Sequence, residues 1–136
     1  MRSETQRRGE LAKCKVMFRA YEKGIIVSEP TVDADYDLVL DVERRLWRCQ
    51  VKYTSSPSSN SIGAVQLSLR RTTRNRKELV YTIGDIDAIL VYLAPCDTVL
   101  WLPEELWDGK TSLQIRYREA KNRQKSRIIW YKDYEW

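Results

Sequence analysis

The first periodic segment of the chain is helical. Between residues 3 and 21 there is no proline, Ser3 is the expected N-cap, and Gly24 is the expected stop. Apolar residues recur in this segment at steps of three and four, the spacing of one helix face. That face consists of Leu11, Cys14, Phe18 and Tyr21. We therefore predict an amphipathic helix with these residues as its apolar face.

Period-two alternation predicts a β-hairpin in the next part of the chain. Its strands cover residues 36–42 and 46–53 and flank a polar turn at 43–45. Alternate positions of the two strands form an apolar face, which we expect on the core side. The members of this face are Tyr36, Leu38, Leu40, Val42, Trp47, Cys49, Val51 and Tyr53.

The register of this hairpin decides which polar residues meet. We place Leu40 opposite Trp47. Asp37 then lies opposite Gln50 on the other face, and a slip of two residues would place it opposite Lys52 instead. Either register gathers Asp37, Gln50 and Lys52, a carboxylate, an amide and an ammonium.

The remaining pattern predicts short strands and turns. We expect a strand at 24–27, a loop at 55–61, a strand at 62–69, a turn or short helix at 81–87, strands at 88–93 and 98–102, a helical turn at 103–107, a strand at 112–117, and either a helix or a strand at 128–134. This order is typical of a mixed α/β (α+β) domain. With 136 residues, we predict a single domain over residues 1–136.

Composition excludes several kinds of chemistry. The chain has no histidine, which removes Ser-His-Asp and Cys-His pairs and histidine-ligated zinc. Cys14, Cys49 and Cys96 form no CxxC motif and cannot all pair, so we expect a reducing, cytoplasmic setting. We find no signal peptide pattern and no apolar stretch of membrane-spanning length.

Positive charge is concentrated in two segments of the chain. The first basic segment (70–77) has five basic residues, and the second (116–127) has six with one acid, so the rest of the chain is net negative. Clustered positive charge on such a body indicates nucleic-acid binding, although two solvated basic connectors remain an alternative. The candidate contacts are Arg70, Arg71, Arg74, Arg76, Lys77, Lys121, Asn122, Arg123 and Gln124.

The polar cluster of the hairpin matches a known pattern. Asp37 is followed after twelve residues by Gln50-Val51-Lys52. This resembles the strand hairpin of the PD-(D/E)XK nuclease superfamily, which carries an Asp and then an acid-x-Lys tripeptide, with Gln50 here replacing the acid. Together with Glu10 on the predicted helix, the Gln-x-Lys form is similar to the small group I intron-encoded homing endonucleases of that superfamily. Further similar segments lie at 85–88, 91–92, 99–103, 121–124 and 133–134.

The resemblance implies a restriction-endonuclease-like core, a mixed β-sheet flanked by helices, and a role for each candidate residue. Asp37 would bind Mg²⁺ or another divalent cation, Glu10 would help directly or through water, and the Val51 carbonyl would be a backbone ligand. Gln50 would give an amide oxygen or orient a metal-bound water. Lys52 would hold the attacking water and stabilise charge on the scissile phosphate. With only two carboxylates, we expect a DNA phosphate to complete the metal's coordination.

The resemblance also implies a substrate and an assembly. The substrate would be double-stranded DNA, cut at a specific sequence by hydrolysis of phosphodiester bonds. One site per chain implies a homo-oligomer, a dimer or a tetramer, for a cut in both strands.

Three other interpretations stay open at this point. The first is a structure-specific nuclease of the Holliday junction resolvase type, whose core is similar. The second is a noncatalytic nucleic-acid-binding protein in which Gln50 prevents turnover. In the third, Glu10 and Lys52 are ordinary solvated residues that lie apart from Asp37.

Overall fold

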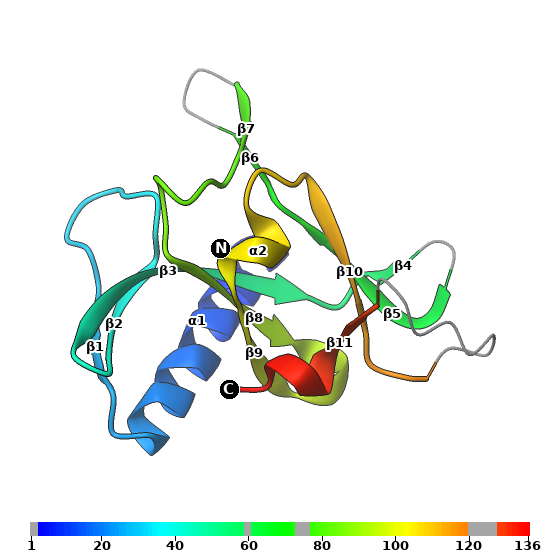
Figure 1. The fold of residues 1–136 in the computed structure, drawn as a ribbon, viewed down its shortest axis with the longest axis horizontal. Helices are drawn as coiled ribbons and strands as arrows, with labels where there is room; N and C mark the ends of the chain where they lie inside the picture. The colour runs from blue at the N-terminus through cyan, green and yellow to red at the C-terminus, as the bar shows by residue number, and fades with distance from the viewer. Residues whose placement is uncertain (1–2, 59–60, 73–76, 120–127) are drawn as a thin grey trace.

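A five-stranded sheet lies at the centre of the fold (Figure 1). The computed structural model describes residues 3–58, 61–72, 77–119 and 128–136. In spatial order the sheet consists of β1 (Ile26–Ser28), β2 (Leu38–Val42), β3 (Arg45–Thr54), β8 (Ala88–Leu93) and β9 (Thr98–Leu102). β3 and β8 run parallel and all other neighbours run antiparallel, so the sheet is mixed as predicted.

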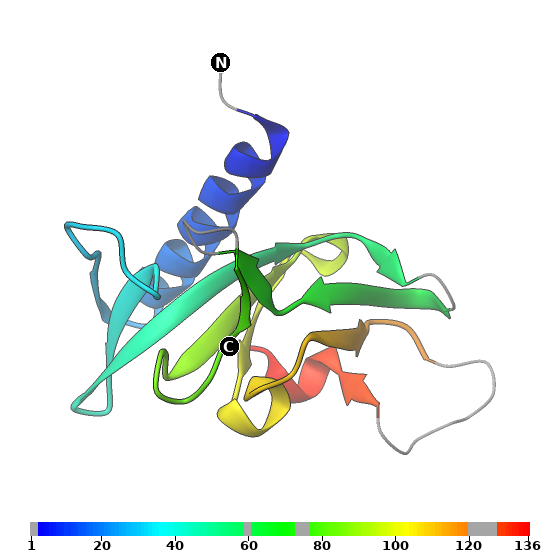
Figure 2. The same cartoon turned by 90° about the horizontal axis from the view of Figure 1, so that it is seen from above.

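The two faces of this sheet are covered differently (Figure 2). α1 (Glu4–Glu22) packs on one face. The other face is covered by a second sheet of β11 (Ile129–Trp130), β10 (Ser112–Arg116), β5 (Ser61–Ser68) and β4 (Pro57–Ser58), with the short helix α2 (Glu104–Trp107). The predicted mixed α/β class is confirmed, but on this second face a sheet takes most of the place that we expected helices to fill.

α1 begins and ends where the sequence predicts. The Ser3 hydroxyl accepts a hydrogen bond from the Gln6 N–H, and the Gln6 side chain accepts one from the Ser3 N–H, both at 3.2 Å. This capping box satisfies two N–H groups that would otherwise lack partners. After the C-cap Lys23, Gly24 has φ +71°, a conformation that favours glycine.

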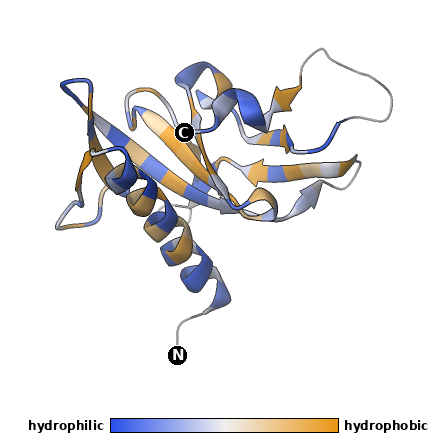
Figure 3. Ribbon diagram, turned by 90° about the horizontal axis from the view of Figure 1, so that it is seen from below, coloured by the Kyte–Doolittle hydropathy of each residue, from blue (hydrophilic) through white to orange (hydrophobic). Residues whose placement is uncertain are grey.

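The predicted apolar face of α1 is wrong. Its buried residues are Ala12, Val16 and Ala20, which pack on the sheet. Small side chains let the helix axis approach the strands closely, whereas large ones would hold it away. The predicted set instead forms an exposed line on the opposite side of the helix, called here the outer stripe: Leu11, Cys14, Phe18 and Tyr21. Figure 3 shows hydrophobic and hydrophilic residues along the whole length of α1.

The predicted hairpin is present as β2 and β3. Leu40 pairs with Trp47, as expected, across a two-residue turn. The turn residues Glu43 and Arg44 have φ +52° and +66°, the left-handed conformation that suits the twist of a tight hairpin. Leu38, Leu40, Cys49 and Val51 lie in the core under α1.

Tyr36 departs from the predicted core face. It packs against the core on the other side of the sheet, with residues of β5 and β8 to β10. β2 begins only at Leu38, so residues 35–37 are not held to the strand alternation. The chain therefore crosses the edge of the sheet just before Leu38, which is where Asp37 lies.

The other predicted elements agree in most cases. The structure has strands at 88–93 and 98–102, a helical turn at 104–107, and strands close to 24–27, 62–69 and 112–117. The predicted loop at 55–61 contains the short strand β4, and the unassigned segment 128–134 becomes β11 followed by a 3-10 turn at Tyr131–Tyr134. No helix in the described part of the chain has the length and apolar character to span a bilayer.

The first basic segment begins in a two-stranded arm. β6 (Arg70–Thr72) pairs with β7 (Glu78–Val80), and this pair extends from the body of the molecule (Figure 1). Its base lies close to Tyr81, a buried residue of the core opposite α1. The arm is therefore connected to the face of β3 that α1 does not cover.

Candidate active site

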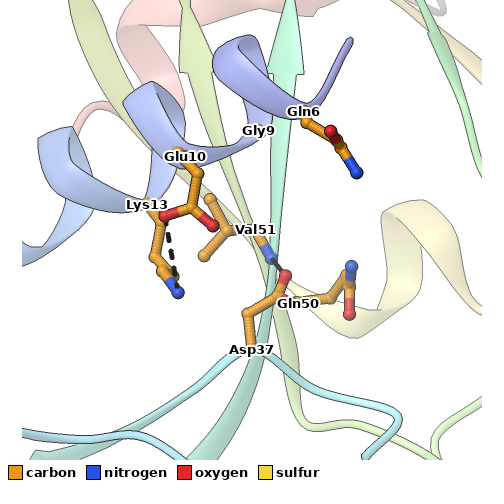
Figure 4. A pocket seen from close by; sticks show the side chains of 7 residues that line it. All are labelled: Gln6, Gly9, Glu10, Lys13, Asp37, Gln50 and Val51. Carbon is orange, nitrogen blue, oxygen red and sulfur yellow. Dashed lines mark hydrogen bonds and ion pairs between the residues drawn. The ribbon is translucent and has the colours of Figure 1, made fainter. Parts of the chain in front are cut away.

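A pocket of about 300 Å³ lies between α1 and the middle of β3 (Figure 4). Its lining comes from α1, from β3, and from the segment that precedes β2. The lining residues are Gln6, Gly9, Glu10, Lys13, Asp37, Gln50 and Val51. Four of the five residues predicted for catalysis or metal binding are among them.

Asp37 lies at an open edge of β3. β2 starts one residue later, with Leu38 opposite Cys49, so in the described part of the chain no strand pairs with β3 on this side beyond Cys49. The Asp37 N–H donates to the Cys49 carbonyl at 2.9 Å, and Asp37 Oδ2 accepts from the Val51 N–H at 2.9 Å. The carboxylate thus takes the position that a strand carbonyl would otherwise occupy.

Glu10 reaches the same space from α1. In Figure 4 the carboxyl groups of Glu10 and Asp37 both point into the gap between α1 and β3. Lys13, one helical turn on, has its Nζ 3.9 Å from Glu10 Oε2 and 3.5 Å from Glu29 Oε2. The Glu10 side chain is 52% exposed, so its carboxylate is accessible to a ligand.

The Gln-Val-Lys tripeptide distributes its side chains over both faces of the sheet. Val51 packs in the core under α1, so the alternation of β3 directs Gln50 and Lys52 to the opposite face. Gln50 lines the pocket, whereas Lys52 lies beside it and is not part of its described lining. The Lys52 Nζ is 5.1 Å from the centre of the Tyr81 ring. The candidate groups therefore surround one edge of β3.

Asp37 and Lys52 influence each other's protonation. Burial raises the pKa of Asp37 above its ordinary value, although the Val51 N–H, Lys13 and Lys52 partly counteract it. Burial likewise lowers the pKa of Lys52, which the charge of Asp37 partly counteracts. Both charged forms are poorly solvated, a state typical of groups that bind a ligand or a reacting atom.

The oxygen donors of the pocket fit a hard divalent cation such as Mg²⁺. Glu10 and Asp37 supply carboxylates, Gln50 supplies an amide, and Val51 supplies a backbone carbonyl. One oxygen of Asp37 accepts the Val51 N–H, which leaves the other for a ligand. The described residues contain no group of three or more His, Cys, Asp or Glu that could hold a metal ion. The two acids of the described pocket lining are Glu10 and Asp37.

The predicted nucleic-acid contacts are described only in part. Arg70 pairs with Glu78 at 3.0 Å, and its side chain is 54% exposed. Arg71 is only 21% exposed and forms ion pairs with Asp35 and Asp85. Lys77 is exposed on the arm. The other candidates lie outside the described residues: Arg74, Arg76, Lys121, Asn122, Arg123 and Gln124.

Sequence reasoning missed several residues of the site. Gln6, Gly9 and Lys13 line the pocket. Helical spacing from Glu10 could have found Gln6 and Lys13, which lie at −4 and +3, but not Gly9, which is adjacent. Tyr81 contacts Lys52 from 29 positions along the chain. No local pattern relates residues so far apart in the sequence.

An aspartate at a strand edge and a glutamate from a helix thus line one pocket. A family model described as PD-(D/E)XK endonuclease matches residues 3–136, so the chain belongs to this family of nucleases. Among solved structures it is similar to the bacterial homing endonuclease I-Ssp6803I, with a TM-score of 0.76 and 26% sequence identity over 98% of this chain and 89% of that chain.

A second solved structure, MepB, has a TM-score of 0.46 and 13% identity over 84% of this chain and 86% of that chain. The comparison with curated proteins gave no match. The family match and the likeness to I-Ssp6803I confirm the resemblance that the motif suggested.

Proposed function

We propose that this protein is a metal-dependent, sequence-specific homing endonuclease that hydrolyses phosphodiester bonds of double-stranded DNA. The observation that carries the proposal is the position of Asp37 at the open edge of β3, with Glu10 and Gln50 in the same pocket and Lys52 beside it. The chain would act inside the cell as one nuclease domain over residues 1–136. Support for the class comes from the family match, and support for the homing role from the likeness to I-Ssp6803I.

Each residue that the sequence predicts for the site has a role in this mechanism. Asp37, Glu10 and the Val51 carbonyl would hold a divalent cation, and Gln50 would hold or orient water at it. When bound, the cation would supply Lewis-acid stabilisation of the phosphate. Lys52 would hydrogen-bond the attacking water and stabilise the negative charge that grows on the phosphate. The Asp37 carboxylate is poorly solvated, and the Val51 N–H, Lys13 and Lys52 only partly offset its desolvation. A cation bound together with the DNA phosphate would stabilise this charge further.

The two basic segments are the proposed contacts to the DNA backbone. The arm of β6 and β7 presents Arg70 and Lys77 on its surface. Phosphate contacts release counterions, so the affinity for DNA should fall steeply as salt is added. A flat salt response in a binding assay would remove these segments from the interface.

A cut in both strands needs two copies of a site that handles one linkage, so we propose a homo-oligomer, a dimer or a tetramer. We assign the contact with a second copy to the outer stripe. Its large residues are exposed along one helix face, while the fully buried residues of α1 are Ala12, Val16 and Ala20. The variant Phe18→Glu should lower the mass measured by analytical ultracentrifugation. An unchanged mass would exclude the outer stripe from the interface.

Cleavage of plasmid DNA carrying a selected target tests the function. We expect cleavage with Mg²⁺, its loss in Asp37→Ala and in Lys52→Ala, and retention of DNA binding by both variants. Cleavage that survives both substitutions would remove these residues from the mechanism. Cleavage of a four-way junction but not of a linear duplex would indicate a resolvase instead, and binding without any cleavage would indicate a noncatalytic protein.

A further inference from the structure

The Lys52 side chain is held by an aromatic ring that the PD-(D/E)XK pattern does not include. The Lys52 Nζ lies 5.1 Å from the centre of the Tyr81 ring, and the Arg71 guanidinium carbon lies 5.2 Å from the same centre. Tyr81 is 3% exposed, so the ring is fixed in the core and cannot follow the motions of a lysine in solvent. Cations are attracted to an aromatic ring at this range, and more strongly where water is excluded.

Arg71 connects this ring to the other side of the site. It pairs with Asp35, two residues before Asp37, and with Asp85 in the turn before β8 at 3.4 Å. The same side chain belongs to β6, at the base of the arm that we assign to DNA. Arg71 therefore joins the arm, the segment that carries Asp37, and the ring that contacts Lys52.

We propose that Tyr81 is a positioning residue, whose ring holds the Lys52 ammonium beside Asp37. Because Arg71 contacts the same ring, Tyr81 also connects Lys52 to the base of the β6–β7 arm. A free lysine side chain populates many rotamers, and fixing it in a reactive position avoids that entropic loss at the moment of reaction. The ring itself touches neither phosphate nor water in this role. The inference rests on the proposed function for its effect on cleavage, but the contact between Lys52 and Tyr81 can be tested without it.

Tyr92 supplies a matched control for Tyr81. It is 6% exposed, and the Nζ of Lys15 lies 5.4 Å from the centre of its ring. Tyr92 belongs to the core under α1, on the face of the sheet opposite Tyr81. The variants Tyr81→Leu and Tyr92→Leu therefore remove the same kind of ring under the same kind of cation, but only the first removes it from Lys52.

The first measurement is NMR of the lysine ε-methylene groups in the intact protein. The Tyr81 ring current should move the Lys52 resonance upfield, and this shift should persist in Tyr81→Phe and Tyr92→Leu and disappear in Tyr81→Leu. A Lys52 resonance at the position of a solvated lysine in the wild-type protein would overturn the inference, whatever the protein's activity.

The second measurement is the single-turnover rate of DNA cleavage at saturating protein and Mg²⁺. Tyr81→Leu should lower the rate about tenfold without a matching change in the Kd for DNA, because the ring acts on Lys52 and not on binding. Tyr81→Phe should retain the rate, since the ring remains. An unchanged rate in Tyr81→Leu, or an equal loss in Tyr81→Phe and Tyr92→Leu, would overturn the positioning role. If the wild-type protein does not cleave, the proposed function fails and the NMR result alone decides the contact.

Discussion

The two halves of β3 use an aspartate in opposite ways. The first half pairs with β2 on one side. On its other side β8 begins only opposite Cys49, and there Asp87 is bound to Arg48: Asp87 Oδ2 accepts from the Arg48 N–H at 2.8 Å and from Arg48 Nε at 3.2 Å. In the second half β2 is absent, and Asp37 receives one backbone N–H, from Val51. Both carboxylates thus accept a β3 N–H just before a neighbouring strand begins, but Asp87 is also bound by the Arg48 guanidinium.

The protonation of the two carboxyl groups follows from this difference. Burial alone would raise the pKa of Asp87, but the hydrogen bonds from Arg48 and the charge of Arg45 outweigh it and hold the pKa below its usual value. Among the described residues Asp37 has no arginine partner of this kind, and burial raises its pKa. A charge that is fully paired within the chain contributes to stability, whereas one that is only partly paired can attract a ligand.

The substitution Asp37→Asn should produce the largest effect. It removes a proposed metal ligand, so DNA cleavage should fall at least about 100-fold. The free energy of unfolding should not fall, because a neutral amide avoids the desolvation that the carboxylate suffers and can still accept the Val51 N–H. Cleavage kinetics and urea unfolding at pH 7 measure the two quantities. Cleavage at the wild-type rate by this variant would contradict the role of Asp37 as the carboxylate that binds a ligand.

Asp87→Asn should show the opposite result. Losing the charged partner of Arg48 should lower the free energy of unfolding by about 1.5–3 kcal/mol, while the folded protein should still cleave DNA. The control is Glu78→Gln, which breaks an exposed ion pair with Arg70 and should cost at most about 1 kcal/mol. An equal loss of unfolding free energy in the two variants would show that the bond to Arg48 stabilises the protein no more than an exposed ion pair does.

Acid should reduce the contribution of Asp87. Because its pKa is lowered in the folded state, the stabilisation is present above the unfolded pKa of about 3.9 and disappears as the pH falls through the lower folded value. The difference in unfolding free energy between the wild-type protein and Asp87→Asn should therefore be constant from pH 7 to 5 and shrink toward pH 3. A difference that grows on acidification would have the wrong sign for this explanation. Urea titrations at each pH provide the measurement.

Gly9→Ala should produce the smallest effect. A Cβ at Gly9 meets no atom within 4 Å, and alanine is favoured over glycine inside a helix by up to about 1 kcal/mol. The variant should therefore be more stable by about that amount. The new methyl group would lie in the pocket, on the helix that faces the open edge of β3. Cleavage should therefore fall several-fold. Unchanged cleavage would mean that the DNA does not approach α1 at this point.

The local geometry of the site follows from the amino-acid sequence. Period-two alternation fixed which residues of β2 and β3 share a face, and the turn fixed the pairing of Leu40 with Trp47. The spacing from Asp37 to Gln50 and Lys52 then identified the superfamily. These features depend on neighbouring positions, where the backbone leaves little freedom.

Which surfaces meet depends on the packing of distant segments and does not follow from the sequence pattern. α1 carries two apolar lines at helical spacing. The line with small side chains packs on the sheet because small side chains let the helix come close enough to the strands to pack densely. Tyr36 crosses to the other core because β2 begins after it, and Tyr81 contacts Lys52 through space alone. Periodicity determines which residues point together, but the partner that covers them depends on shapes contributed by distant parts of the chain.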